Sequence, residues 1–304
     1  MIILNKKVFE EYSKLSLKDK ITLSKKIIKE FINDRNEYQS YISCSFGKDS
    51  IVLVDIVRSI YPEIPIVYIN TGIEYPSCVE LSKSYKNVYT ITPKKDMKEI
   101  IEKYGYITPY EKEISGAIEQ VRRNLYNGDC DTYRVKQFRG EIGYNYKKFV
   151  KDLLAPFKIS DKCCYHLKIS PLNKFCKEND YKYSFVGITF EESNLRKRNL
   201  IKNGFNTEFQ SKPLGFWTNN DILQYILDKN LSLAKCYGKI IEKNGGLKTS
   251  LCQRNGCMCC PIWAQEEVPN KFQLLYKYDK ENWDYIINDL GFQKVLDWFN
   301  IEYK

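Results

Sequence analysis

Apolar positions recur with two different spacings along this chain. From residue 8 to residue 36, leucine, isoleucine and phenylalanine return every three or four positions among lysines and glutamates, a pattern that predicts an amphipathic helix. Shorter runs with β-branched and aromatic residues predict strands at residues 39–44, 66–70, 88–92 and 183–188. The first segment is therefore expected to pack as a helix at the start of the fold, and the later runs to build a sheet.

Helical patterns separate the predicted strands. Residues 51–57 continue as a helix after the first strand, and another helix is expected from residue 219 to about residue 228, with Thr218 placed to cap it. The polar residues 191–193 predict a turn after the last strand, and the aromatic stretch after Pro261 is expected to be helical scaffold. Because strands that alternate with helices form parallel sheets, we expect an α/β fold with a twisted parallel sheet flanked by helices.

The same patterns predict three parts along the chain. Residues 1–36 are expected to form a helical segment, residues 37–230 the α/β domain, and residues 231–304 a C-terminal region with cysteines and helices. In parallel sheets of this kind, ligands bind at the carboxyl ends of the strands. Functional residues are therefore expected in the loops that follow the strands.

Composition and charge narrow the class of protein. With 304 residues, 43% of them apolar and 28% charged, the chain is expected to fold throughout. The net charge of +10 favours a polyanionic partner such as a nucleotide or nucleic acid, although a generally lysine-rich surface is the alternative. Because no signal-peptide stretch and no run of about 18 apolar residues is found, we expect a cytoplasmic protein without a membrane span.

The first predicted strand leads directly into the loop Ser45-Phe46-Gly47-Lys48-Asp49-Ser50, which opens a helix. Backbone N–H groups, two hydroxyls and the positive end of a helix dipole then converge on one anion, for which phosphate is the natural ligand. Gly47 permits close backbone approach, and the Lys48 ammonium adds a charge-assisted contact. Asp49 is expected to orient the loop or to help hold Mg²⁺. The loop lacks the Gly-Lys-Ser/Thr ending of a Walker motif, which disfavours a P-loop motor or GTPase.

The cysteines divide into scattered and clustered ones. Five are scattered and are expected mostly as buried hydrophobic residues, namely Cys44, Cys78, Cys130, Cys176 and Cys236. The clustered ones are the adjacent pair Cys163-Cys164 and a later group of Cys252, Cys257, Cys259 and Cys260. In a reducing compartment clustered thiols more often bind metal, and the adjacent pair with the C-x-x-C of Cys257 and Cys260 provides four thiolates. Spacing alone leaves open an iron–sulfur cluster or zinc.

The loop at residues 45–50 resembles the pyrophosphate-binding loop of the adenine-nucleotide α-hydrolase superfamily, and most closely its phosphoadenosine phosphosulfate reductase branch. The resemblance extends, in order, over residues 70–76, 103–105, 163–172, 187–196, 213–214 and 217–218. It implies an adenine-nucleotide-binding α/β fold in which residues 45–50 and the segment Asn70-Thr71-Gly72 bind ATP or an adenylyl sulfate. It also implies a 4Fe-4S cluster on Cys163, Cys164, Cys257 and Cys260, with zinc as the alternative.

Two features of this sequence differ from those of the enzymes that it resembles. Many of them have an arginine where Thr189 stands, so one contact to a phosphate or sulfate is missing. Arg196, Arg198 and the pair Arg122-Arg123 remain as candidate anion ligands, the alternative for each being a solvated surface arginine. The sulfonucleotide reductases also carry a nucleophilic cysteine near the C-terminus, whereas no cysteine follows Cys260 in this sequence.

These departures favour an ATP pyrophosphatase that adenylates an acceptor for sulfur transfer, of the nucleic-acid thiolation or phosphorothioation type. Lys48, Asp49 and Arg196 are its expected catalytic residues, with Mg²⁺ as a cofactor and a cysteine desulfurase or similar protein as the sulfur donor. One alternative is a sulfonucleotide reductase that uses Cys252 or Cys259 as its nucleophile. Another is a non-catalytic sensor of nucleotide or redox state. Nothing in the sequence indicates an oligomeric state.

Overall fold

The computed structural model describes residues 5–33 and 35–304, and this described chain forms two compact units. One, which we call the sheet unit, comprises Met1–Asn70, Glu74–Thr92 and Leu172–Asn255. The other, the helical unit, comprises the segments Thr71–Ile73, Pro93–Pro171 and Gly256–Lys304. Each unit is thus assembled from segments far apart in the sequence. The domain boundaries expected at residues 36 and 230 instead divide the chain into consecutive segments. They remain a proposal.

The sheet unit contains, among the described residues, a five-stranded parallel sheet in the order β3-β2-β1-β4-β5. The strands are β1 (Ser40–Ser43), β2 (Ile66–Ile69), β3 (Val88–Ile91), β4 (Tyr183–Val186) and β5 (Gln210–Ser211). In the central pairing, Ile42 of β1 lies opposite Ile66 of β2 and Phe185 of β4. The parallel α/β sheet predicted from the sequence is confirmed. The two-residue β5 was not predicted.

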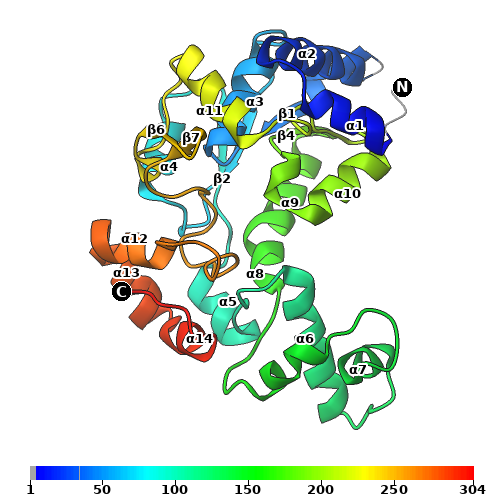
Figure 1. The fold of residues 1–304 in the computed structure, drawn as a ribbon, viewed down its shortest axis with the longest axis vertical. Coiled ribbons are helices and arrows are strands. Elements are labelled where there is room, and N and C mark those ends of the chain that lie inside the picture. The colour runs from blue at the N-terminus through cyan, green and yellow to red at the C-terminus, as the bar shows by residue number, and fades with distance from the viewer. Residues whose placement is uncertain (1–4, 34) are drawn as a thin grey trace. The chain divides into compact units, whose positions relative to one another are not determined.

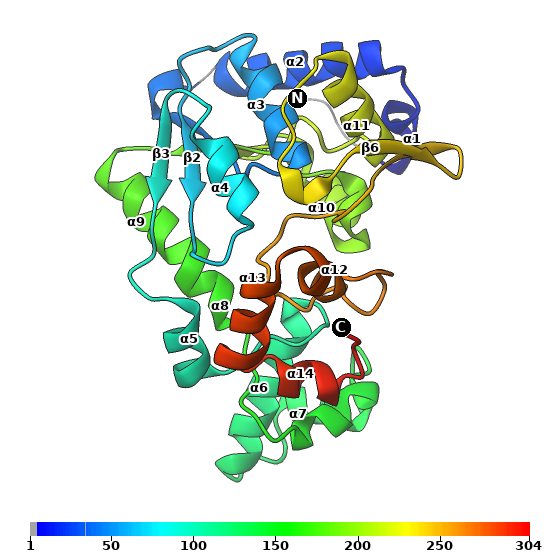
Figure 2. The same ribbon diagram turned by 90° about the vertical axis from the view of Figure 1, so that its left-hand side faces the viewer.

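Helices surround this sheet, as Figures 1 and 2 show. They are α1 (Lys6–Ser13), α2 (Leu17–Asn33), α3 (Lys48–Arg58), α4 (Pro76–Ser82), α9 (Ser170–Glu178, which begins in the helical unit), α10 (Asn194–Asn203) and α11 (Asn219–Asp228), with short turns η1 (Glu37–Gln39), η4 (Phe190–Glu192) and η5 (Lys235–Tyr237). The predicted helix at 219–228 and its Thr218 cap are confirmed, because the Thr218 hydroxyl accepts the Asp221 N–H at 3.1 Å. A hairpin of β6 (Ile240–Lys243) and β7 (Gly246–Thr249) was not predicted.

The expected single helix over residues 8–36 is wrong, because the chain forms α1 and α2 with a break between them. Ser16 causes the break: its hydroxyl accepts the Asp19 N–H at 3.2 Å, and its carbonyl accepts the Lys20 N–H at 2.9 Å, which starts a new helix. The break lets α1 turn so that Phe9 packs edge-on against Phe190, with ring centroids 5.4 Å apart. Residue 34, within the expected helix, lies outside the described residues.

A buried polar path joins α2 to the segment before α11. The Trp217 indole N–H donates to the Ser24 hydroxyl at 2.9 Å, and that hydroxyl donates to the Pro213 carbonyl at 2.7 Å. One turn earlier on α2, the Lys20 ammonium lies 2.5 Å from the Asp221 carboxylate, although Lys20 is only 2% exposed. A buried ammonium is tolerated only when it is paired, so this ion pair fixes α11 against α2.

The helical unit has a core of its own. Its elements are α5 (Met97–Tyr104), α6 (Lys112–Tyr126), α7 (Tyr133–Arg139), η2 (Lys147–Leu154), α8 (Lys162–Cys164), the π-helical turn η3 (Tyr165–Ile169), α12 (Lys271–Tyr278), α13 (Lys280–Asp284), the π-helical turn η6 (Tyr285–Asp289) and α14 (Gln293–Trp298). The helices after Pro261 confirm the predicted helical scaffold. Tyr106 stands edge-on to both Phe157 and Phe292 in this core. Across residues 5–33 and 35–304, no helix combines the length and hydropathy needed to cross a bilayer.

The Lys20–Asp221 pair yields a test of the fold. Replacing Asp221→Asn is expected to lower the free energy of unfolding of the sheet unit by about 3 kcal/mol, because the Lys20 ammonium would stay buried without its counter-charge. Lys26→Ala is the control, since Lys26 pairs with Glu30 on the exposed face of α2. Chemical denaturation followed by circular dichroism measures both, and equal effects of the two substitutions would contradict the assignment.

Candidate functional site

The loop at residues 45–50 connects β1 to α3 at the carboxyl end of the sheet, where a ligand site was expected. Gly47 is the N-terminal cap of α3, and its carbonyl accepts the Ile51 N–H at 3.0 Å. The Ser50 hydroxyl donates to that same carbonyl at 2.9 Å and lies 3.5 Å from the Ser45 hydroxyl. The two serine hydroxyls and the first N–H groups of α3 are therefore gathered at one helix N-terminus, where an anion is stabilised.

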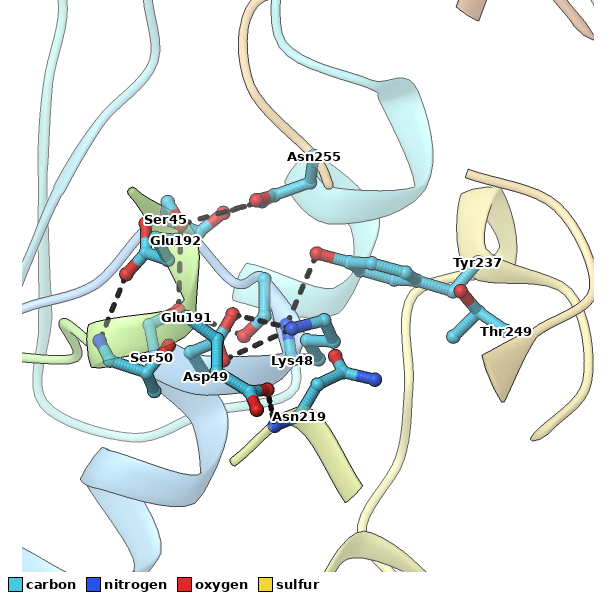
Figure 3. A network of polar contacts seen from close by, with 12 residues as sticks. Ser45, Lys48, Asp49, Ser50, Glu191, Glu192, Asn219, Tyr237, Thr249 and Asn255 are labelled. Atoms are coloured by element: carbon cyan, nitrogen blue, oxygen red, sulfur yellow. Dashed lines mark hydrogen bonds and ion pairs between the residues drawn. The ribbon is translucent and has the colours of Figure 1, made fainter. Parts of the chain in front are cut away.

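Lys48 and Asp49 form an ion pair within the loop. The Lys48 ammonium lies 3.1 Å from Oδ1 and 3.0 Å from Oδ2 of Asp49, and Lys48 is only 7% exposed. The Asp49 carboxylate thus holds the Lys48 ammonium at the start of α3, and its expected role in orienting the loop or holding Mg²⁺ remains a prediction. Figure 3 shows the pair at the start of α3.

Phe46 anchors the loop through its side chain. It is fully buried, with its ring 5.1 Å from that of Tyr68 on β2 and 5.3 Å from that of Tyr85. Its φ of 54° places a non-glycine residue in the left-handed region, which costs conformational energy that the buried ring offsets. Phe46 was predicted as part of the nucleotide site, and the structure assigns its ring to the core beneath the loop.

Two side chains that the sequence did not single out cover the loop (Figure 3). The Tyr237 hydroxyl accepts the Lys48 backbone N–H at 3.2 Å. The Asn255 amide donates to the Ser45 carbonyl at 2.9 Å and lies 3.4 Å from the Ser45 hydroxyl. This approach requires glycine at position 47, because a Cβ there would stand 2.4 Å from the Asn255 side-chain oxygen. A phosphate at the loop would have to replace these contacts or share them.

The segment after β4 borders the same loop. A Cβ at Gly187 would stand 3.1 Å from the Asp49 carbonyl, so a larger residue there would push the chain after β4 away from the start of α3. Thr189 is buried and caps the short turn η4, and its N–H donates to the Glu192 carboxylate at 3.0 Å. Arg196 pairs with that same Glu192 carboxylate and is half-exposed. Its predicted catalytic role is untested, and its guanidinium already has a carboxylate partner.

The second predicted nucleotide segment is divided between the units. Asn70 follows β2 in the sheet unit, and its N–H donates to the Ile91 carbonyl at 2.9 Å. Thr71 and Gly72 belong to the helical unit, and Gly72 adopts a φ of 79° that favours glycine. The nucleotide contacts of these three residues remain a prediction.

In the helical unit, the Cys163-Cys164 pair lies on α8, and Lys112 of α6 is close to it. A hydrogen bond from Cys163 and the nearby Lys112 ammonium lower the pKa of Cys164, while the bond to Cys164 raises that of Cys163. A thiolate stabilised in this way is the form that binds metal. Lys112 was not predicted from the sequence, because nothing near it in the chain marks it.

The C-x-x-C segment of the same unit forms a turn, in which the Cys260 N–H donates to the Cys257 carbonyl at 3.0 Å. The buried Lys271 ammonium donates to that carbonyl at 3.3 Å. Cys257 and Cys260 both contribute to raising the pKa of Cys163, so all four predicted ligands are electrostatic neighbours. No cluster of three or more His, Cys, Asp or Glu side chains within residues 5–33 and 35–304 has the arrangement to hold a metal ion.

Arg122, His166 and Cys259 also lie in the helical unit, where each is hydrogen-bonded, stacked or buried. Arg122 donates to the carbonyls of Leu153, Ala155 and Phe157, so its guanidinium holds the chain after η2. His166 stacks on Tyr104 with ring centroids 4.7 Å apart. Among the surplus cysteines, burial raises the pKa of Cys259 well above its usual value.

Comparison with known proteins supports the family resemblance. The sequence model of the phosphoadenosine phosphosulfate reductase domain matches residues 39–125 and 112–262. A phosphoadenosine 5'-phosphosulfate reductase of Alteromonas mediterranea is 21% identical over 63% of this chain and 61% of its own length. An adenosine 5'-phosphosulfate reductase of Staphylococcus epidermidis is 25% identical over 68% of this chain and 69% of its own. The match to the first of these relatives thus spans less than two thirds of its length.

Solved structures with a similar arrangement are more distant. The phosphate complex of a phosphoadenylyl-sulfate reductase from Candida auris is 13% identical, with a TM-score of 0.41 over 77% of this chain and 91% of that one. A U34-tRNA thiolase from Methanococcus maripaludis, solved with its 4Fe-4S cluster, is 14% identical, with a TM-score of 0.39 over 94% and 82%. Likenesses this weak say nothing about the chemistry of this chain. The domain match, which covers most of the chain, is decisive: the protein belongs to the phosphoadenosine phosphosulfate reductase domain family.

Proposed function

We propose that this protein is an ATP pyrophosphatase that adenylates an acceptor for sulfur transfer, with a nucleic acid as the acceptor. The observation that carries the proposal is the loop at residues 45–50, which gathers two serine hydroxyls, a buried lysine and the N-terminus of α3 at the end of β1. Such a set of donors stabilises the charge of a leaving pyrophosphate. The net charge of +10 suits a polyanionic acceptor.

The reaction would proceed in two displacements. An acceptor oxygen attacks the α-phosphorus of ATP, the bond to the β-phosphate oxygen breaks, and pyrophosphate leaves with that electron pair. Hydrosulfide, which a thiol reductant releases from the persulfide of a donor protein such as a cysteine desulfurase, then attacks the activated carbon or phosphorus of the acceptor, and AMP leaves with the former acceptor oxygen. Ser45, Ser50 and Lys48 would hold the pyrophosphate, Asp49 would orient Lys48, and Mg²⁺ would neutralise the phosphate charge.

The surroundings of the loop offer fewer free cations to a sulfate than those of many family members do. Thr189, which replaces an arginine of many family members, is buried and caps η4, so it offers no cation to a sulfate. Arg196 is bound to Glu192, which would have to release it before an anion could bind. Each of these features weakens the recognition of a second anionic group.

A 4Fe-4S cluster on Cys163, Cys164, Cys257 and Cys260 is part of the proposal, and the four thiols would have to rearrange to bind it, because they do not form a metal site within residues 5–33 and 35–304. The support is the chemistry of the donor set, since the bond from Cys163 and the charge of Lys112 favour a thiolate at Cys164 and all four thiols interact electrostatically. Such a cluster would supply electron transfer or a binding site for sulfide. Four thiolates would also suit zinc, so metal analysis must distinguish the two.

A second candidate is a sulfonucleotide reductase, because the relatives from Alteromonas mediterranea and Staphylococcus epidermidis carry that activity in their names. With two electrons from an added dithiol, it would release sulfite from an adenylyl sulfate, and it would form no pyrophosphate. A sensor without catalysis would bind nucleotide and form neither product. Incubation with ATP–Mg²⁺ and, separately, with adenylyl sulfates, followed by assays of pyrophosphate and sulfite, separates the three.

Lys48→Ala tests the loop directly. We expect kcat/KM for pyrophosphate release from ATP–Mg²⁺ to fall by a factor of about 10² to 10³, because a buried positive charge aimed at the leaving group is lost. Lys229→Ala is the matched control, since Lys229 is an exposed lysine at the end of α11 in the same unit. A Lys48→Ala enzyme as active as this control would exclude the loop from catalysis.

Anaerobic purification tests the metal centre. The native protein is expected to contain about four irons and four sulfides per chain, and Cys164→Ser to lose most of both. Cys130→Ser should keep the full content, because Cys130 is an exposed cysteine outside the predicted ligand set. Zinc in place of iron, or an unchanged iron content in Cys164→Ser, would contradict the assigned centre.

A further inference from the structure

Three cysteines that lie far apart in the sequence meet in the sheet unit. The Cys78 sulfur on α4 lies 3.9 Å from the Cys236 sulfur on η5. Cys236 also shares a hydrogen bond with Cys252, and the Cys252 N–H donates to the Cys236 carbonyl at 3.2 Å. None of the three belongs to the proposed metal centre. The scattered cysteines were expected mostly as buried hydrophobic residues; Cys78 is buried, and the structure brings its sulfur against that of Cys236.

A hydrogen bond already holds the chain segments of Cys78 and Cys236 together. The Cys236 N–H donates to the hydroxyl of Ser77, the residue before Cys78, at 3.0 Å. Two sulfurs in contact, on segments tied by a hydrogen bond beside them, can close from 3.9 Å to the bond length of about 2.05 Å with little movement of either chain. The arrangement therefore suits a disulfide.

Each cysteine of the pair lies next to a residue that contacts the nucleotide loop. The Asn255 amide, which donates to the Ser45 carbonyl, also lies 3.7 Å from the Cys78 sulfur. On the other side, Cys236 precedes Tyr237, whose hydroxyl accepts the Lys48 N–H. The two side chains that cover the loop are thus connected to the two cysteines.

We propose that Cys78 and Cys236 are a reversible dithiol–disulfide site, which a low-molecular-weight disulfide such as oxidised glutathione closes, clamping Asn255 and Tyr237 over the loop. One cysteine attacks the glutathione disulfide and releases the first glutathione thiol. The other cysteine then attacks this mixed disulfide and releases the second. The two cysteines lose two protons and two electrons, and the glutathione disulfide gains them.

Access and reactivity set the rate of this exchange. Cys236 is half-buried and forms the entrance, whereas Cys78 is 1% exposed and acts second. The hydrogen bond to Cys252, with burial, raises the pKa of Cys236 to about 12. Since the thiolate is the nucleophile, exchange is slow at neutral pH and accelerates as the pH rises. The site therefore responds to sustained oxidation rather than to brief exposure.

The disulfide would act by fixing the two covering side chains. To admit a phosphate, Asn255 and Tyr237 would have to move aside in the reduced protein, and a cross-link between α4 and η5 would restrict that movement. The oxidised protein should therefore bind ATP several-fold more weakly. This consequence rests on the proposed function, but the formation of the disulfide does not.

The test incubates the whole protein with oxidised glutathione at about pH 9, where more of the thiol is ionised. Intact-mass spectrometry and peptide mapping should find a Cys78–Cys236 disulfide, lower in mass by two hydrogens and restored by dithiothreitol. Cys130, which is exposed, should become a mixed disulfide with glutathione and so shows that the oxidant is active. Hydrogen exchange of the amides at residues 45–50 should slow in the oxidised protein.

Matched variants make the outcome decisive. Cys236→Ser should abolish both the disulfide and the change in exchange, and Cys176→Ser, another partly buried cysteine of the sheet unit, should leave both unchanged. Free Cys78 and Cys236 beside a modified Cys130 would overturn the proposal, as would a Cys236–Cys252 disulfide or unchanged exchange at the loop. These readouts need no nucleotide, so a failure to bind ATP would contradict only the proposed function.

Discussion

The turn at Gly47, where β1 ends and α3 begins, is the constraint on which the sheet unit depends. A parallel strand that passes directly into a helix leaves the first N–H groups of the helix without intrahelical partners, and these groups need an acceptor. In this protein the Tyr237 hydroxyl meets one of them, and the Asn255 amide fills the space that a side chain at Gly47 would occupy. The N–H groups that need an acceptor in the free protein also make the turn suitable for binding a phosphate.

The core under the loop and the chain after β4 support this turn. The Phe46 ring is buried against Tyr68 and Tyr85, which fixes the loop in a left-handed conformation that a freely solvated chain would leave. Gly187 lets β4 end against the start of α3. The geometry of the anion site is therefore a consequence of core packing, and the loop needs no ligand to hold its shape.

Cysteines in this chain differ in chemistry because their surroundings differ. Burial raises the pKa of Cys44 to about 11 and makes it an inert packing residue, as the sequence suggested. The bond from Cys163, with Lys112, lowers the pKa of Cys164 and favours its thiolate form. Cys78 and Cys236 instead meet as a pair beside the nucleotide loop. Residue type limits what a thiol can do, and the neighbouring charges and hydrogen bonds select among those possibilities.

The sequence alone determined the features that depend on local order: the strands β1 to β4, the helices α3 and α11, the nucleotide loop between β1 and α3, the Thr218 cap, and the family. Each of these features depends on a few consecutive residues, whose spacing and turn chemistry restrict the backbone. Tertiary structure alone decided the break at Ser16, the two units assembled from interleaved segments, the covering of the loop by Tyr237 and Asn255, and the meeting of Cys78 with Cys236. These depend on which distant residues come into contact, and no spacing along the chain encodes such contacts.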